Sequence, residues 1–184
     1  MKDLSNKLKK ATLAAGCFWC VEAIFKNLNG VVEVVSGYSG GKPDEANYES
    51  VKTGMTAHAE VCQITFDETV ITFEKLLEVF FRVHNPTTLN QQGADIGPQY
   101  RSAIFYHNLE QHEISKNVIE ALDKSGAFDN KIVTSLERFE DFIKAEDYHQ
   151  NYFEQNENSN QYCTLVIRPK VEKFQKAFGE LLKK

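Results

Sequence analysis

The chain has 184 residues, of which 42% are hydrophobic and 26% charged, and its net charge is −5 at pH 7. These proportions are typical of a folded globular chain and argue against disorder. An acidic balance disfavours a general nucleic-acid binder, and no run of about 20 apolar residues could span a membrane. Residues 1–10 hold four lysines without the apolar core of a secretory signal, so we expect a cytosolic address. The length predicts a single domain over residues 1–184.

Apolar periodicity divides the chain into alternating strands and helices. Strands are expected at 11–15, 31–37, 58–66, 101–106 and 131–136, and helices at 18–28, 73–83, 109–124, 146–155 and 170–182. We expect Asn29-Gly30 to end the first helix and Thr72 to cap the second. The first six elements run β-α-β-β-α-β, which predicts an α+β fold with a ferredoxin-like (split βαβ) α/β plait core and extra C-terminal helices. Two long loops, 38–48 and 85–100, are expected to be functional.

A cysteine stands where the first strand turns into the first helix. Gly16 allows a tight turn there, and Cys17 follows it at the start of the helix. Free N–H groups and the helix dipole favour an anion at that position, which predicts a lowered thiol pKa and a nucleophilic thiolate. The alternative is a small buried hydrophobic residue. Phe18 and Trp19 are candidates for the wall of an apolar pocket, or for the core.

The chain has four cysteines, too few for a disulfide scaffold. Cys20 lies three residues after Cys17, on the same helix face. It could form a disulfide with an oxidised Cys17, pack in the core, or bind zinc. Structural zinc usually takes four ligands from two C-x-x-C pairs, and only one such pair is present, so we predict no metal and no cofactor. Cys62 lies within a strand and is expected to be structural, and Cys163 lies far along the chain.

Six segments together resemble one known family. They are Gly-Cys-Phe-Trp at 16–19, Ser-Gly-Tyr-Ser-Gly-Gly at 36–41, His-Ala-Glu at 58–60, Gln-Gly-Ala-Asp-Ile-Gly at 92–97, Gln-Tyr-Arg-Ser at 99–102 and Ala-Glu-Asp-Tyr-His-Gln-Asn-Tyr at 145–152. In this order they resemble the A-type peptide methionine sulfoxide reductases, over about residues 10 to 178. The resemblance implies a single catalytic domain, a monomer, that reduces methionine S-sulfoxide, free or in oxidised proteins.

The resemblance also implies the first catalytic step, in which the Cys17 thiolate attacks the sulfoxide sulfur. Sulfoxide oxygen leaves poorly unless it is protonated, and Glu60 matches the family's acid. A carboxyl in that role must be protonated near neutral pH, which burial can arrange. Strand alternation puts Glu60 on the same face as Ile64 and Phe66, an apolar setting, although surface exposure is the common fate of a Glu. Glu22 is the rival carboxyl, which we expect to be structural or solvated.

Further residues match the family's substrate pocket. Tyr48 and Tyr100 match two tyrosines whose hydroxyls bind the sulfoxide oxygen. Asp95 matches an acidic residue that fixes the substrate, and Phe18 and Trp19 are expected to hold the S-methyl group. His58 and His149 are expected to be structural or to support the site indirectly.

After methionine leaves, Cys17 is a sulfenic acid that condenses with a thiol. The resemblance implies a second cysteine for this step and thioredoxin as the final reductant. Many members have glycine where this chain has Cys20 and resolve near the C-terminus. We favour Cys20 because its sulfur is close, with Cys163 as the alternative resolver or a relay.

Two other functions fit single features of the chain. A thioredoxin-type oxidoreductase also opens a helix with C-x-x-C after a strand, but the β-α-β-β-α-β order and the aromatic pair within the motif disfavour it. A non-catalytic zinc or protein-interaction module is the second alternative.

Overall fold

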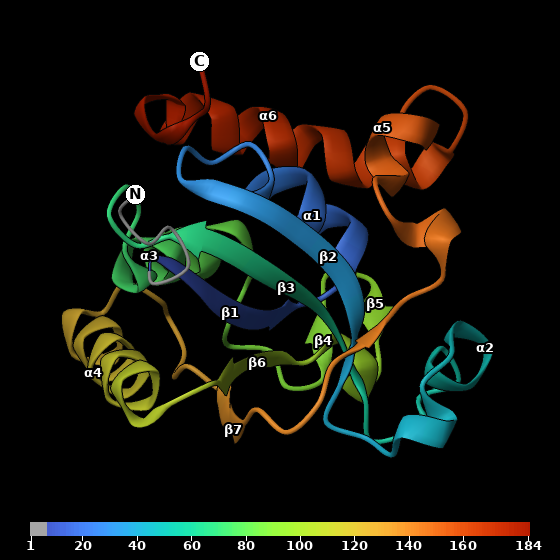
Figure 1. The fold of residues 1–184 in the computed structure, drawn as a ribbon, viewed down its shortest axis with the longest axis horizontal. Coiled ribbons are helices and arrows are strands. Elements are labelled where there is room, and N and C mark those ends of the chain that lie inside the picture. The colour runs from blue at the N-terminus through green and yellow to red at the C-terminus, as the bar shows by residue number, and fades with distance from the viewer. Residues whose placement is uncertain (1–6) are drawn as a thin grey trace.

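The computed structural model describes residues 7–184. Its centre is a six-stranded sheet in the order β7-β6-β1-β3-β2-β8 (Figure 1). The strands of this sheet are β1 (Leu8–Ala15), β2 (Val31–Ser39), β3 (Ala59–Asp67), β6 (Ser102–Tyr106), β7 (Ser135–Arg138) and β8 (Ile143–Lys144). β1 pairs antiparallel with both β3 and β6, β2 pairs antiparallel with β3 and β8, and β7 runs parallel to β6. The chain is therefore an α+β protein built on one mixed sheet.

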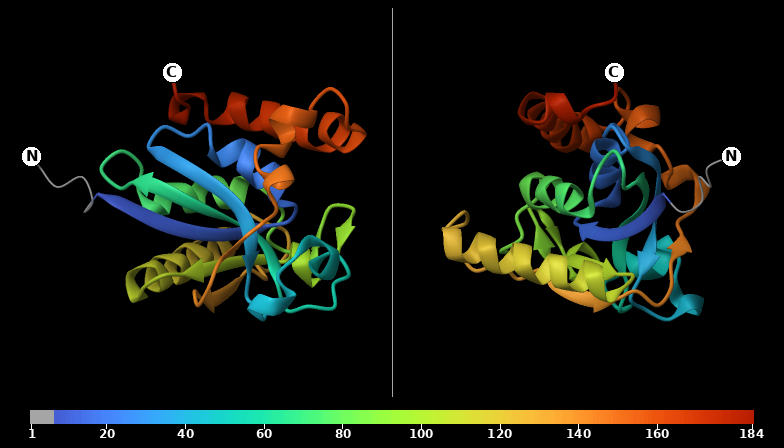
Figure 2. Two further views of the ribbon diagram at one scale, coloured as in Figure 1. Left: turned by 45° about the vertical axis from the view of Figure 1, so that its right-hand side comes forward. Right: turned by 60° about the vertical axis from the view of Figure 1, so that its left-hand side comes forward.

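The helices are α1 (Phe18–Phe25), α2 (Tyr48–Val51), α3 (Phe73–Val83), α4 (Leu109–Ser125), α5 (Tyr152–Asn156) and α6 (Arg168–Ala177). A separate two-stranded hairpin, β4 (Gln91–Gln92) and β5 (Asp95–Ile96), lies between α3 and β6. α6 lies along the outer side of α1, so the C-terminal part of the chain covers the helix that begins at the cysteine motif (Figures 1 and 2).

β3 is buried on both faces of the sheet. Cys62, Ile64 and Phe66 belong to the main core beneath α1 and α3. Ala59 and Val61 face the other way, into a smaller core covered by a partly buried aromatic segment near residues 139–142. The predicted alternation of this strand is therefore confirmed, and both of its faces are apolar.

Several predicted boundaries are confirmed. α3 spans the residues predicted for the second helix, and the Thr72 side chain accepts a hydrogen bond from the Lys75 N–H at 3.2 Å. α4 ends at Ser125, where Gly126 takes the left-handed conformation that suits a helix C-terminus.

The predicted end of the first helix is wrong. α1 ends at Phe25, and Leu28 instead forms a bridge with Leu182 from the C-terminus. Gly30, at φ +92°, turns the chain into β2, and an added Cβ there would lie 2.6 Å from the Ile71 side chain. The glycine therefore shapes a connection rather than a helix cap.

The later predicted elements are shifted or broken. The strand expected at 131–136 begins only at Ser135, because the Ile132 N–H donates to the Asp123 side chain and the Val133 N–H to the Pro86 carbonyl. The helix expected at 146–155 is interrupted at Asn151, whose φ of +54° separates a 3-10 turn from α5. The helix expected at 170–182 begins at Arg168, ends at Ala177 and follows a π-helical turn, Cys163–Ile167.

The two long loops contain short elements. β2 extends to Ser39, and α2 begins at Tyr48 after Asn47, whose side chain accepts from the Ser50 N–H at 3.0 Å. The second loop contains the β4–β5 hairpin and a 3-10 turn, Pro98–Tyr100. Both loops thus contain short regular elements, which fix the positions of the side chains that they carry, including Tyr48 and Tyr100.

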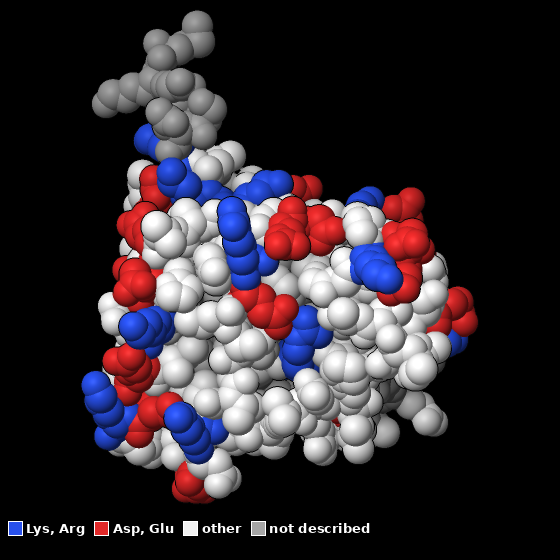
Figure 3. Space-filling model, turned by 90° about the horizontal axis from the view of Figure 1, so that it is seen from below, with Lys and Arg blue, Asp and Glu red and all other residues white. Residues whose placement is uncertain are grey.

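The face seen from below carries acidic and basic side chains of both signs, side by side along its margins (Figure 3). Mixed signs are typical of an ordinary solvated surface. Among residues 7–184, no helix is both long and apolar enough to cross a membrane. The expectation about the first ten residues falls mostly on positions 1–6, outside the described part of the chain.

Candidate active site

A tight turn fixes the cysteine motif. Gly16, between β1 and α1, has φ +86°, and a Cβ at this position would lie 2.7 Å from the Gln92 Cγ. Gln92 cannot yield easily, since its side-chain amide is bound to the backbone of Asn85 through both an N–H and a carbonyl. Only glycine therefore fits the turn, which places Cys17 directly before the first residue of α1.

A pocket of about 230 Å³ opens beside this turn. Its lining consists of Cys17, Phe18, Trp19, Tyr48, Glu60, Asp95, Tyr100 and Tyr162. Seven of these eight residues are site residues predicted from the sequence, and those seven come from five separate stretches of the chain. Cys20 and Cys163, the predicted candidates for the resolving thiol, lie outside the lining.

Glu60 stands under the first turn of α1. It is 3% exposed, and its Oε2 accepts a hydrogen bond from the Phe18 N–H at 3.1 Å. Burial raises the pKa of Glu60 to about 8, the Phe18 N–H opposes that rise, and Asp95 and Cys20 add to it. The burial of Glu60 confirms the expected apolar setting. A pKa of about 8 leaves the carboxyl mostly protonated at neutral pH, the state that the acid role requires.

The predicted pKa of Cys17 is wrong in direction. The backbone N–H of Trp19, at the helix start, does lower the pKa of the Cys17 thiol. Burial has the larger effect, and together with the hydrogen bond to Cys20 it raises that pKa well above its ordinary value. Position at a helix start therefore does not by itself predict the pKa of a thiol, because the burial of the sulfur has the larger effect.

Cys20 lies in the first turn of α1, and its backbone N–H donates to the Cys17 carbonyl at 3.1 Å. The neighbouring Cys17 thiol lowers the pKa of Cys20 against the opposing effect of burial. Lys170 of α6 also lowers that pKa. Cys20 is therefore adjacent to Cys17, as a resolving thiol requires.

Two tyrosine side chains from the long loops face the same pocket. Tyr48 begins α2, and its N–H donates to Glu146 Oε1 at 2.7 Å. Tyr100 ends the 3-10 turn before β6. Burial raises the pKa of both phenols, so both stay protonated and can donate hydrogen bonds.

Asp95 of β5 is held by Tyr162, a residue that the sequence reasoning missed. The Tyr162 hydroxyl donates to Asp95 Oδ2 at 2.6 Å, across 67 positions of sequence. The only hint in the sequence is that Tyr162 directly precedes Cys163. Local periodicity contains no information about a contact between the β4–β5 hairpin and the segment before α6.

Aromatic rings form one wall of the pocket. Trp19 stacks on Tyr152 with ring centroids 3.7 Å apart and 6° between planes. Its indole N–H donates to His149 Nδ1 at 3.0 Å, and His149 is fully buried against Phe18. His149 thus supports the aromatic wall, as expected for a structural histidine.

The remaining two cysteines differ in setting. Cys62 is fully buried in β3, and its Sγ lies 3.5 Å from the Phe18 carbonyl, consistent with a structural role. Cys163 is also fully buried and begins the π-helical turn. Burial raises the pKa of Cys163, and the nearby Cys20 adds to this effect. Cys163 therefore lies outside the pocket of Cys17.

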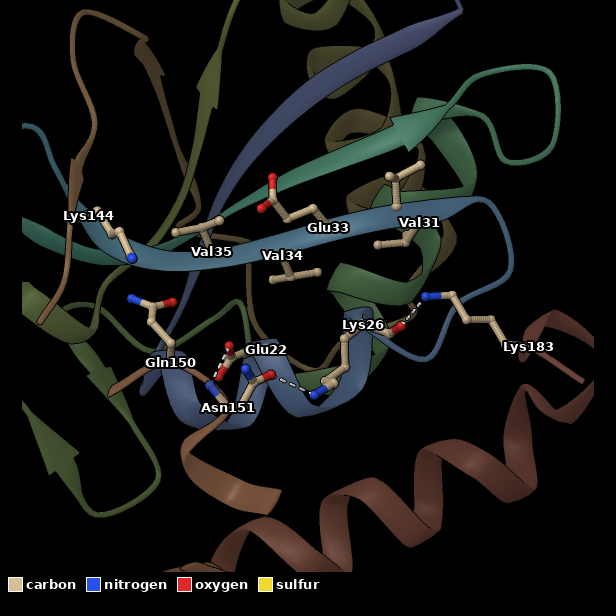
Figure 4. A pocket seen from close by; sticks show the side chains of 11 residues that line it. Glu22, Lys26, Val31, Glu33, Val34, Val35, Lys144, Gln150, Asn151 and Lys183 are labelled. Carbon is tan, nitrogen blue, oxygen red and sulfur yellow. Dashed lines mark hydrogen bonds between the residues drawn. The ribbon is translucent and has the colours of Figure 1, made fainter. Parts of the chain in front are cut away.

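A second cleft, of about 370 Å³, follows the first part of β2, residues 31–35, along the edge that β8 pairs with only from Gly37 onward (Figure 4). Glu22 is 2% exposed there and accepts from the Asn151 N–H at 2.8 Å. Lys26 donates to the Asn151 side chain at 2.8 Å, and Lys183 donates to the Lys26 carbonyl at 2.6 Å. These polar groups are engaged with one another, so the cleft joins α1 to the turn before α5. Glu22 is therefore structural, which is one of the two alternatives expected from the sequence.

Within residues 7–184, no three His, Cys, Asp or Glu side chains gather closely enough to hold a metal ion. The pocket combines one thiol, a carboxyl whose pKa is raised and phenolic donors, and a second thiol, that of Cys20, lies one helical turn from the first. An α+β protein with this site is a thiol-dependent oxidoreductase.

Comparisons with known proteins identify the family. Residues 9–182 match the family model described as peptide methionine sulfoxide reductase. The protein named peptide methionine sulfoxide reductase MsrA from Natronomonas pharaonis is 51% identical over 170 residues, covering 92% of this chain and 95% of that one. The chain therefore belongs to the peptide methionine sulfoxide reductase family, and it reduces methionine sulfoxide with its thiols.

Solved structures agree with this assignment. Reduced Mxr1 from Saccharomyces cerevisiae has a TM-score of 0.75 at 37% identity, covering 86% of this chain and 91% of that chain. Mxr1 in complex with Trx2, from the same organism, has a TM-score of 0.53 at 30% identity, covering 83% and 89%.

Proposed function

We propose that this chain reduces the S epimer of methionine sulfoxide, free or within oxidised proteins, with Cys17 as nucleophile and Glu60 as general acid. The observation that carries the proposal is the placement of both groups in one pocket, with the carboxyl pKa raised to about 8. A buried neutral acid can deliver the proton that sulfoxide oxygen needs before the S–O bond breaks.

The first half of the reaction transfers oxygen to the enzyme. The Cys17 sulfur attacks the sulfoxide sulfur while Glu60 protonates the sulfoxide oxygen, and Tyr48 and Tyr100 donate hydrogen bonds to that oxygen as it gains negative charge. Methionine leaves reduced by two electrons, and Cys17 becomes a sulfenic acid, oxidised by two electrons. The Cys17 proton re-enters the pocket and restores Glu60.

Phe18, Trp19 and Asp95 are proposed to bind the substrate. The rings of Phe18 and Trp19 present an apolar wall for the S-methyl group, and His149 and Tyr152 hold the indole in place. Asp95 faces the same pocket and is positioned to accept a hydrogen bond from a polar group of the methionine backbone.

The second half forms a disulfide. Cys20 attacks the Cys17 sulfenic sulfur, an S–S bond forms, the S–O bond breaks and water leaves. Cys20 is favoured because it lies in the same helical turn as Cys17, with its N–H on the Cys17 carbonyl, whereas Cys163 lies in the π-helical turn before α6 and outside the pocket. Cys163 remains the alternative resolver, or a relay that exchanges with Cys20.

Thioredoxin is the proposed reductant of this disulfide, by thiol–disulfide exchange. The solved complex of Mxr1 with Trx2 supports this choice. The reaction consumes reducing equivalents, which a cytosolic address would supply. We also propose a single catalytic domain over the whole chain with a ferredoxin-like core, supported by the order β6-β1-β3-β2 of the four strands nearest the site.

A single-turnover experiment tests the proposal. Reduced protein is mixed with S and R epimers of a methionine sulfoxide peptide, without external reductant, and methionine is counted per enzyme. We expect about one methionine per enzyme from the S epimer and none from the R epimer. Methionine from the R epimer, or from neither, contradicts the proposal.

The resolving thiol is tested in the same mixture by mapping the disulfide with mass spectrometry. We expect a Cys17–Cys20 bond in the parent and in Cys163→Ser. Cys20→Ser is expected to form methionine once and then to hold a sulfenic acid that dimedone traps. A Cys17–Cys163 bond in the parent would contradict the assignment of Cys20.

A further inference from the structure

One histidine ring lies between the aromatic wall of the pocket and the loop that carries Tyr48. His149 is fully buried, and its Nδ1 accepts the Trp19 indole N–H at 3.0 Å. Its ring packs on that of Tyr48, with the centroids 4.5 Å apart. His149 is not among the residues that line the pocket, so it acts on a bound substrate only through these two neighbours.

The indole fixes which nitrogen of His149 holds the proton. An indole N–H can only donate, so the Nδ1 that faces it must have a free lone pair. A neutral imidazole has a single N–H, which therefore lies on Nε2. Burial lowers the pKa of His149 from its ordinary 6.5, against the opposing effect of Glu146, so the ring is neutral at pH 7.

The Nε2 proton lies toward a carboxylate of the same turn. Nε2 is buried 3.6 Å from Glu146 Oε2, and it has no hydrogen-bond partner of normal length among the described residues. The contact is therefore the electrostatic attraction of an N–H to a carboxylate, longer than a hydrogen bond. An unpaired buried donor costs free energy, and the requirement of Trp19 for a bare Nδ1 explains why the proton is there.

Glu146 extends this connection to the backbone of Tyr48. Its Oε1 accepts the Tyr48 N–H at 2.7 Å, and its Oε2 accepts the Tyr38 hydroxyl at 2.8 Å. Burial raises the pKa of Glu146, but these donors and its own N–H outweigh burial and hold that pKa below its ordinary value. Tyr48 is thus held twice, by the Glu146 carboxylate at its backbone and by the His149 ring at its phenol.

We propose that His149 is a positioning residue that aligns the two sides of the substrate site through one fixed tautomer. Its bare Nδ1 holds the Trp19 indole in the wall for the S-methyl group. Its ring and its Nε2–H hold Tyr48 toward the sulfoxide oxygen, directly and through Glu146. A proton on Nδ1 would set two donors face to face and release the indole. The inference rests on the proposed function, which gives Trp19 and Tyr48 their roles.

The tautomer is tested on the unmutated, reduced protein. Long-range proton–nitrogen-15 correlation spectra of the histidine rings show which nitrogen holds the proton, and the nuclear Overhauser effect from the Trp19 indole proton assigns the His149 ring. We expect Nε2–H at pH 7. Trp19 is the only tryptophan of the chain, so its fluorescence is expected to change with a midpoint below pH 6.5, as Nδ1 gains a proton. His149→Asn should remove this step.

The other titratable groups that face His149 do not produce such a step. They are Tyr48 of α2, Glu146 and Tyr148 of its own turn, and Tyr152 of α5. From α1 the ring meets only Phe18 and Trp19, which do not titrate. Phenols ionise far above pH 7, and the pKa of Glu146 lies below its ordinary 4.5. A fluorescence step between pH 5 and 6.5 therefore belongs to the histidine.

Two substitutions separate the acceptor of His149 from its ring. His149→Phe keeps a ring against Tyr48 and removes both nitrogens. His149→Asn removes the ring and keeps an acceptor, because Oδ1 lies as many bonds from Cα as Nδ1 does. His112→Phe is the matched control, since His112 lies on α4 against Tyr106 and outside the pocket. Single turnovers with the S-epimer peptide give the half-saturating concentration and the rate at saturation.

For His149→Phe we expect half-saturation to rise about tenfold, the effect of a buried indole N–H left unpaired, with the rate at saturation within about threefold of the parent. For His149→Asn we expect the reverse. Half-saturation should stay within about threefold, and the rate should fall about tenfold because Tyr48 loses the ring that positions its phenol. His112→Phe should match the parent in both quantities.

The inference fails if the neutral His149 ring holds its proton on Nδ1, or if the fluorescence step persists in His149→Asn. It also fails if both His149 variants change half-saturation and rate alike, as a general loss of structure would. Failure of the proposed function looks different. In that case the parent protein makes no methionine from the S epimer, whichever nitrogen of His149 holds the proton.

Discussion

Two buried carboxyls lie at α1, one on β3 beneath its first turn and one within the helix, and burial raises the pKa of both. For Glu60 the pKa rises to about 8, because Asp95 and Cys20 add to the effect of burial while the Phe18 N–H, which donates to the carboxyl, opposes it. For Glu22 the Asn151 N–H and the Lys26 ammonium both oppose the rise. Burial is common to the two carboxyls, and the difference lies in the charged neighbours: a lysine acts on the carboxyl of the cleft, whereas an acidic residue and a thiol act on that of the pocket.

The chemistry of the pocket depends first on its nucleophile, Cys17. Cys17→Ser is expected to reduce single-turnover methionine formation by at least about 10³-fold, because a serine hydroxyl is a far weaker nucleophile in this setting. Methionine release is measured with the S-epimer peptide, and circular dichroism controls for folding. Near-normal release by a folded Cys17→Ser protein would contradict the mechanism.

Matched amide substitutions separate the two carboxyls. Glu60→Gln is expected to slow sulfoxide reduction by about 10²- to 10³-fold, because an amide cannot deliver the proton. Cys17 should still be alkylated by iodoacetamide. Glu22→Gln is the control and should stay within about threefold of the parent. Equal losses in both variants would mean that Glu60 acts only through the fold.

The pocket should also make stability depend on pH. The folded protein binds the Glu60 proton more tightly than the unfolded chain, with a pKa of about 8 against an ordinary 4.5. This contribution is complete below pH 4.5 and is lost as the pH rises through 8, at a cost of about 5 kcal/mol. Urea unfolding of reduced protein between pH 5 and 8 should therefore show the parent losing stability relative to Glu60→Gln. Parallel pH curves for the two proteins are the opposing result.

The smallest expected effect belongs to the cleft. Glu22→Gln is expected to change the free energy of unfolding by less than about 1 kcal/mol at pH 7, because burial, which raises the pKa of Glu22 and disfavours its charge, offsets what the Asn151 N–H and Lys26 contribute. Urea unfolding at one pH measures this change. A loss of several kcal/mol would contradict this balance, since the charged carboxylate would then be a net support of the fold.

Much of the fold follows from local patterns in the sequence. The alternation of β3 and the amphipathic run of α3 with its Thr72 cap both predicted structure that is present. The failures share a cause. Residues 131–133 and the segment around Asn151 are held by hydrogen bonds to distant partners, and no local pattern reports those partners.

The site divides in the same way. Cys17, Glu60 and the two loop tyrosines could be predicted because motif resemblance assigns them, and the pocket unites them. The pKa of Cys17 could not be predicted from the sequence, because it depends on how fully the sulfur is buried. The place of Tyr162 in the pocket could not be predicted either, because its contact with Asp95 joins two segments that only the folded chain brings together.

The central claim is that Glu60 keeps its proton at neutral pH, and its titration tests this most directly. Carbon-13 NMR of Glu side-chain carboxyls in the reduced protein follows each group with pH, and Glu60→Gln assigns the signal. The account predicts a midpoint of about 8 for Glu60. A midpoint near the ordinary value of 4.5 would contradict it, because the carboxyl would then hold no proton to give.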